Sequence, residues 1–129
     1  MNVLVIGGVA AGTKAAAKLK RCDRSAKVTI ITKDVDISYA GCGLPYYVGG
    51  LIESRDELII NTPEKYAALT GVTVLTGREA VKVDPENKCV EAKNLRDNSV
   101  ENYTYDELII ASGASASVPP VAGTDKDGV

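Results

Sequence analysis

The segment Asn2-Val-Leu-Val-Ile-Gly-Gly-Val-Ala-Ala-Gly12 begins with a continuous apolar run and ends in a glycine-rich turn. Such a run is typical of a strand that is buried on both faces of a parallel sheet. Residues 10–21 are mostly small or helix-favouring, and residues 28–31 form a second apolar, β-branched run. Residues 2–31 therefore predict a right-handed βαβ unit with two parallel strands.

The rest of the chain predicts a further helix and several short strands. Thr62 is a capping residue followed by proline, and Gly71 is a stop signal, so a helix is expected over residues 62–69. Residues 106–111 return to the buried parallel pattern, and residues 112–120 predict an extended loop. Short strands that form a small antiparallel meander are expected over residues 72–75, 79–84, 88–93 and 100–105.

Composition and charge limit the size, the partners and the location that the sequence predicts. The 129 residues, of which 45% are hydrophobic, suffice for one domain at most. The 15 basic and 17 acidic residues leave no basic stripe, so nucleic acid is not an expected partner. Without a secretion signal or an apolar run of about 18 residues, the sequence predicts a cytoplasmic protein with no membrane partner. Histidine is absent, and no metal site is expected.

The turn over residues 7–12 predicts a nucleotide site. Gly7 and Gly12 match the outer glycines of the fingerprint G-x-G-x-x-G, whereas Val9 takes the middle position. The turn closes a buried strand and opens a helix, which favours nucleotide binding over simple packing. Thr32 stands where an acidic residue usually holds the ribose, and Asp34 could take over that role.

Cys42 lies between two glycines and just before Leu44-Pro45, so its sulfur is sterically open. A short helix that begins near this residue would direct amide dipoles at a thiolate and stabilise it. Since no second cysteine lies within a turn, the expected products are a mixed disulfide, a persulfide or a sulfenic acid. Cys22 and Cys89 are expected to be small buried hydrophobes, and no disulfide is expected.

Three stretches together resemble one enzyme family. They are the turn over residues 7–12, the segment Ser38-Tyr-Ala-Gly-Cys-Gly-Leu-Pro-Tyr-Tyr-Val-Gly-Gly50, and the segment Tyr105-Asp-Glu-Leu-Ile-Ile-Ala-Ser-Gly-Ala114. The chain resembles the N-terminal part of the FAD-dependent pyridine nucleotide-disulfide oxidoreductases. Within them it is most similar to the single-cysteine branch of coenzyme A-disulfide reductases, persulfide reductases and NADH oxidases.

The resemblance implies an α/β fold, namely a Rossmann-like, FAD-binding, three-layer domain with a central parallel sheet and the antiparallel meander. It also implies that NAD(P)H reduces FAD and that the flavin passes electrons to Cys42, which reduces a low-molecular-weight disulfide or persulfide of the coenzyme A type. By this resemblance, the residues expected at the cofactor are Gly7, Gly8, Val9, Ala10, Ala11, Gly12, Thr32, Lys33, Cys42, Ala80, Val81, Ala111, Ser112, Gly113 and Ala114. Those expected at the substrate are Lys14, Lys18, Arg21 and Ser38.

The sequence also departs from the family pattern. Gly41 replaces the usual asparagine, Thr32 the usual glutamate and Ser112 the usual threonine. NADH oxidases normally have a histidine at the position of Ala10, so its absence favours disulfide or persulfide reduction over oxygen chemistry.

Residues 1–129 match only the first part of the FAD domain, without the NAD(P)H domain and the dimerisation domain. We therefore expect an incomplete domain of a homodimeric protein, inactive by itself. Two alternatives stay open: a non-catalytic nucleotide-binding module in which Cys42 is structural, and a fragment of an NADH oxidase or dehydrogenase.

Overall fold

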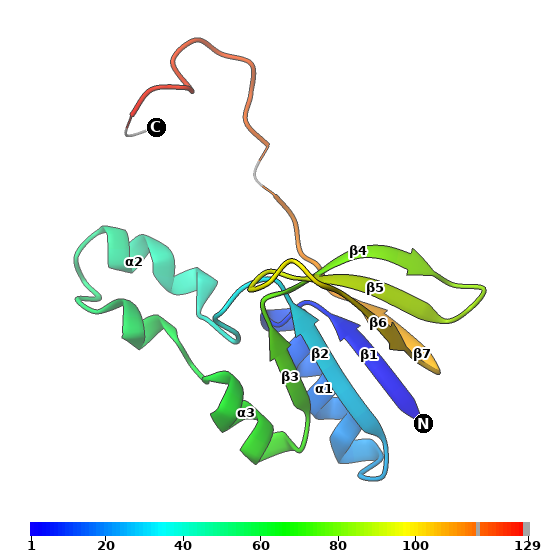
Figure 1. Cartoon of the computed structure of the whole chain (residues 1–129). Coiled ribbons are helices and arrows are strands. Elements are labelled where there is room, and N and C mark those ends of the chain that lie inside the picture. The colour runs from blue at the N-terminus through cyan, green and yellow to red at the C-terminus, as the bar shows by residue number, and fades with distance from the viewer. Residues whose placement is uncertain (116, 128–129) are drawn as a thin grey trace.

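The computed structural model describes residues 1–115 and 117–127, which form two sheets and the helices that cover them (Figure 1). The parallel sheet has the strand order β3-β2-β1-β7, and the antiparallel sheet has the order β4-β5-β6. The strands of the parallel sheet are β1 (Asn2–Ile6), β2 (Lys27–Thr32), β3 (Thr73–Thr76) and β7 (Glu107–Ile110). Those of the antiparallel sheet are β4 (Arg78–Asp84), β5 (Cys89–Asn94) and β6 (Val100–Thr104).

The strand β1 lies at the centre of the parallel sheet, as its apolar sequence predicts. Val3, Leu4 and Val5 are buried. Val5 faces Ile30 of β2 on one side and Ile109 of β7 on the other, and both pairings are parallel. The βαβ unit is completed by α1 (Ala10–Cys22), which connects β1 to β2.

The two faces of the parallel sheet bury different partners, because successive side chains of a strand point to opposite faces. On one face, Val3 and Val5 pack with Ala16 of α1 and with Tyr66 of α3 (Pro63–Thr70). On the other face, Leu4 packs with side chains of the meander, such as Val90. Helices, parallel sheet and meander therefore make three layers (Figure 1), which confirms the expected fold class.

The assignment of residues 72–75 to the meander is wrong. The strand β3 pairs in parallel with β2, with Leu75 opposite Ile31, and is an edge strand of the central sheet. The expected helix before it is confirmed: the Thr62 side chain caps α3, and Gly71 ends it in a left-handed conformation. Since α3 packs on the same face as α1, the chain returns from it into the parallel sheet.

The other expected strands are confirmed to within one or two residues at each end. The expected loop after β7 contains no strand or helix in its described part, and Ala116 lies outside the described residues.

A helical segment lies between β2 and α3. The helix expected near Cys42 is present as a 3-10 turn, η1 (Gly41–Gly43), followed by α2 (Leu44–Val48). A further 3-10 turn, η2 (Arg55–Leu58), was not predicted, although Ser54 and Glu57 form a capping box that the sequence contains. Within residues 1–115 and 117–127, every helix is too short to cross a membrane.

Candidate functional site

A cavity of about 620 Å³ opens at the carboxyl ends of β1 and β2, beside the residues that follow β7 and the first residues of β4. Open parallel sheets bind their ligands at this edge. The cavity is lined by Ile6, Gly7, Gly8, Val9, Ala10, Ala11, Ile31, Thr32, Lys33, Asp34, Tyr39, Arg78, Glu79, Ala80, Ala111, Ser112, Gly113, Ala114 and Ser115.

The glycine turn forms the floor of this cavity, and its two outer glycines are sterically required. Gly7 has a φ of +109°, and a Cβ there would lie 2.1 Å from the carbonyl oxygen of Ala111. A Cβ on Gly12 would lie 1.9 Å from the carbonyl oxygen of Gly7. The first contact is with the residue that follows β7, and the second brings the start of α1 directly against the turn, which is the role of the third glycine of the fingerprint.

No capping or acidic side chain at the amino end of α1 competes with a ligand for the backbone amides. Val9 is the N-cap residue, and it offers no side-chain cap, while the first turn of the helix contains no acidic residue. The amides and the positive end of the helix dipole are therefore available for an anion in the cavity.

The residues expected around the ribose also line the cavity. Thr32 is buried at the end of β2, and its Cγ2 would lie 3.1 Å from a Cβ on Gly8. Lys33 and Asp34 follow it and are exposed. Thr32 is thus packed against the glycine turn, and a cation and a carboxylate stand at the rim.

Three residues expected at the cofactor do not line the cavity and stay predictions there. Gly12 lies beneath the turn in the packing contact with Gly7. Val81 is 52% exposed, and the chain bulges between Ala80 and Lys82. Cys42 is exposed on η1.

Although Cys42 lies outside the lining, its loop is tied to the glycine turn. The backbone N–H of Ser38, which has a φ of +52°, donates a hydrogen bond of 3.0 Å to the carbonyl oxygen of Gly8. The N–H of Ala40 donates to the carbonyl oxygen of Leu58 at 2.8 Å. The segment that carries Cys42 is therefore held at both the cavity and η2.

A second cavity of about 450 Å³ lies beside the first and shares Asp34 and Tyr39 with it. Its remaining lining is Val35, Asp36, Leu44, Tyr47, Arg55, Leu58 and Ile59. It therefore lies between the loop after β2, the helix α2 and the turn η2, on the side of the structure that carries Cys42.

The expectation that Cys22 and Cys89 are buried is wrong. Cys22 is the last residue of α1 and is exposed, whereas Cys89 is half-buried, with its sulfur 3.9 Å from Oδ1 of Asn102. Both residues stand at the ends of their elements.

The basic residues expected at the substrate lie on one helix. Lys14, Lys18 and Arg21 are exposed on α1 and are four and three residues apart, so they share a face of the helix. Ser38 is half-buried beside the glycine turn. Among the described residues, no three acidic or cysteine side chains gather in a metal-binding arrangement.

The most informative residue that the sequence reasoning missed is Arg78, at the first position of β4. It lines the cavity and forms an ion pair of 3.2 Å with Glu101. Hydrogen bonds from Tyr103 and from Arg78 hold the pKa of Glu101 below its usual range. The two-residue period of a strand could have found Arg78, because it places residues 78 and 80 on the same face of β4.

Comparison with known proteins identifies the family. A family model described as pyridine nucleotide-disulphide oxidoreductase matches residues 1–129. The chain belongs to the pyridine nucleotide-disulphide oxidoreductase family. The cofactors of the family are FAD and NAD(P)H.

Individual members of the pyridine nucleotide-disulphide oxidoreductase family give the same result. An NADH oxidase of Methanocaldococcus jannaschii is 35% identical over all of this chain and 29% of its own length. A coenzyme A disulfide reductase of Staphylococcus epidermidis is 34% identical over 90% of this chain and 26% of its own length. The structure of an NAD-dependent persulfide reductase from A. fulgidus is 40% identical, with a TM-score of 0.92 over 99% of this chain and 24% of that chain. The chain thus spans less than a third of the length of these relatives.

Proposed function

We propose that residues 1–129 are the FAD-binding part of an oxidoreductase that passes electrons from NAD(P)H through FAD to Cys42, which reduces a low-molecular-weight disulfide or persulfide. The observation that carries this proposal is the uncapped start of α1 at the glycine turn, which opens onto the cavity of about 620 Å³. A pyrophosphate needs such a set of free amides, a thin turn and room for two nucleotide halves.

The residues present fit a dinucleotide. The backbone of residues 7–12 would hold the pyrophosphate, and Thr32 and Lys33 would flank the ribose next to the adenine. Ala80 and Val81 would offer backbone groups to the adenine, and residues 111–114 would cover the cofactor. Bound FAD would supply the redox chemistry that links NAD(P)H to the Cys42 thiol.

Cys42 is suited to act on a disulfide because its thiol is exposed and its loop is bonded to the glycine turn. The Cys42 thiolate would attack one sulfur of the substrate, form a mixed disulfide and release the other half as a thiolate, which takes up a proton from water. Two electrons that originate from NAD(P)H and one proton would then break the mixed disulfide, release the second thiol and restore the thiolate.

The relatives and the charge of α1 support a substrate of the coenzyme A type. Lys14, Lys18 and Arg21 present three cations on one helix face, which would attract the phosphates of such a substrate. Ser38 would contact the substrate beside the glycine turn. The relative from Staphylococcus epidermidis, named a coenzyme A disulfide reductase, covers most of the chain. We further propose that the whole protein is a homodimer.

A second candidate function is the reduction of oxygen by NADH. It is favoured by the relative from Methanocaldococcus jannaschii, which is named an NADH oxidase and covers the whole chain. The residue at position 10 argues against it, because alanine cannot serve as a proton donor there.

The test is a single-turnover experiment on the whole protein loaded with FAD, because residues 1–129 are expected to be inactive by themselves. The bound flavin is photoreduced without oxygen, and coenzyme A disulfide, a glutathione persulfide or oxygen is then added. We expect disulfide or persulfide to restore the visible flavin absorbance rapidly in the wild type and in Cys22→Ser, which loses another exposed thiol. In Cys42→Ser the same reaction should be lost.

Each other outcome supports a different reading. Equal reoxidation by disulfide in the wild type and in Cys42→Ser would defeat the role of Cys42. Fast reoxidation by oxygen alone would support the oxidase. Binding of FAD without transfer to any acceptor would support a non-catalytic nucleotide-binding module.

A further inference from the structure

The start of β4 brings an arginine into the dinucleotide cavity. Arg78 and Ala80 both line this cavity, together with Thr32 and Lys33 at the end of β2. In the proposed complex, this side of the cavity receives the adenosine half of the cofactor, since the pyrophosphate lies at the glycine turn. Arg78 is therefore a neighbour of the base.

The guanidinium of Arg78 is fixed by hydrogen bonds that lie in its own plane. Its Nε and Nη2 donate to the carboxylate of Glu101 at 3.3 and 3.2 Å, and its Nη1 donates to the carbonyl oxygen of Thr76 at 3.0 Å. The side chain is only 20% exposed. Bonds of this kind use the edges of the group and not its faces, and a flat, weakly hydrated face stacks well on aromatic rings.

Glu101 is in turn held by its neighbours in the meander. The Tyr103 hydroxyl donates to Oε2, and Nδ2 of Asn94 donates to Oε1 at 3.0 Å. Asn94 is itself buried and accepts a bond from the N–H of Arg96 at 3.0 Å. The carboxylate is thus immobilised from all three strands of the meander, and it offsets the charge of Arg78.

We propose that the face of the Arg78 guanidinium stacks on the adenine ring of the bound dinucleotide, with Glu101 as the positioning residue that holds the guanidinium flat. This inference rests on the proposed function, in which the cavity holds FAD. A contact between Arg78 and a phosphate is disfavoured, because Glu101 already neutralises the arginine and the glycine turn offers its own amides.

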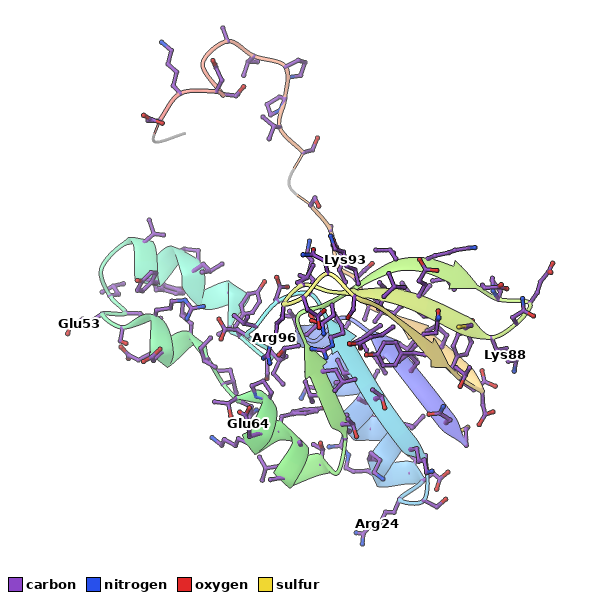
Figure 2. All side chains as sticks on the ribbon, viewed as in Figure 1. Arg24, Glu53, Glu64, Lys88, Lys93 and Arg96 are labelled. Carbon is purple, nitrogen blue, oxygen red and sulfur yellow. The ribbon has the colours of Figure 1, made fainter. Side chains whose placement is uncertain are left out.

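The test compares the dissociation constants of FAD, ADP and FMN, of which FMN lacks adenine. In Arg78→Leu, FAD and ADP should bind on the order of tenfold more weakly, whereas FMN should be unaffected. Arg78→Lys keeps the charge without the flat face, and its affinity for FAD and ADP should fall as much as that of Arg78→Leu. Arg24→Leu is the matched control, since Figure 2 shows Arg24 beyond the carboxyl end of α1, at the opposite end of the parallel strands from the cavity, and its ligand affinities should be unchanged.

The positioning role of Glu101 has its own readout. Glu101→Ala should weaken ADP binding in the wild type but have no further effect on ADP in the Arg78→Leu background, because the two residues would act as one unit. The affinity for FMN reports whether the cavity is still folded in each variant.

Three outcomes would overturn the inference. Full affinity for ADP in Arg78→Lys would show that charge alone matters, and equal losses for FAD and FMN in Arg78→Leu would show a structural role. Additive effects of Glu101→Ala and Arg78→Leu would remove the positioning role. In each case the wild type still binds FAD, so the proposed function survives, whereas a wild type that binds neither FAD nor ADP defeats both.

Discussion

Gly7 is constrained twice, by its backbone conformation and by its neighbour. Its φ of +109° strains any other residue, and a Cβ would lie 2.1 Å from the carbonyl oxygen of Ala111. Gly7→Ala should therefore lower the free energy of unfolding by about 2–5 kcal/mol and weaken FAD binding. Urea unfolding followed by circular dichroism measures the change.

Gly41→Ala is the matched control, because a Cβ there meets nothing closer than 3.6 Å. It should leave the urea midpoint unchanged. A loss at Gly41 as large as the loss at Gly7 would contradict the steric argument.

Tyr66 joins α3 to α1 through one hydrogen bond, which its hydroxyl donates to the carbonyl oxygen of Thr13. Tyr66→Phe removes this donor in a buried place and should cost about 1 kcal/mol in the free energy of unfolding. Tyr46→Phe changes an exposed tyrosine in the same way and should cost nothing measurable. Equal urea midpoints for the two variants would refute this contribution.

High pH should remove the contribution of Tyr66 to the free energy of unfolding. Burial raises the pKa of the Tyr66 phenol above its usual value near 10. Its contribution to stability is therefore complete below about pH 10 and is lost as the pH rises through the folded pKa. The difference in unfolding free energy between the wild type and Tyr66→Phe should shrink above that value.

The structural roles of some residues could be predicted from the sequence, and those of others could not. Gly7 and Gly12 could be predicted to line or support a turn, because their spacing follows from the steric needs of that turn. Arg78 could be predicted to share a face of β4 with Ala80, but the position of its guanidinium could not, since it depends on Glu101, a residue of another strand. The exposure of Cys22 was missed because burial at the end of a helix depends on what packs there.

At the scale of elements, the carboxylate of Glu101 connects β6 to β4 and β5 through hydrogen bonds with Arg78 and Asn94. The pKa of Glu101 is lowered mainly by Tyr103 and then by Arg78. Its contribution to stability is present above the unfolded pKa of about 4.3 and is lost as the pH falls through the lower folded pKa. Glu101→Gln should therefore destabilise the protein at neutral pH, with an effect that fades as the pH falls below the unfolded pKa and then through the folded one.

Comparison of Glu101→Gln with the wild type isolates this carboxylate from Asp97, whose pKa is also lowered, mainly by Ser99 and in part by Arg78. Denaturant unfolding at several pH values gives the difference. A destabilisation that is constant from neutral to acidic pH would rule out the ionised carboxylate as its cause.

The sheet to which a short strand belongs is harder to predict than the strand itself. The apolar, β-branched residues of β3 predicted a strand, yet nothing in residues 72–75 distinguishes the meander from the central sheet. The pairing of Leu75 with Ile31 joins residues far apart in the sequence. In contrast, the βαβ unit was predictable because β1, α1 and β2 follow one another closely in the sequence and such a connection has a fixed handedness.

At the scale of the whole molecule, stability is unevenly distributed. The strands β1 and β2 are buried between two layers, whereas α2 contains no buried residue and exposes Tyr46 and Val48. Amide hydrogens of α2 should exchange at least on the order of tenfold faster than those of α1. Hydrogen exchange measured by mass spectrometry tests this, and equal protection of the two helices would contradict it.

The order of the central sheet has a consequence for synthesis on the ribosome. β1 is translated first, but one of its two neighbours is β7, so that Asn2 meets Asp106 across nearly the whole chain. Until Ile110 leaves the exit tunnel, the apolar strand β1 of the nascent polypeptide has no partner strand at one of its edges. Chaperones that shield such edges should therefore matter most for this protein while translation is still under way.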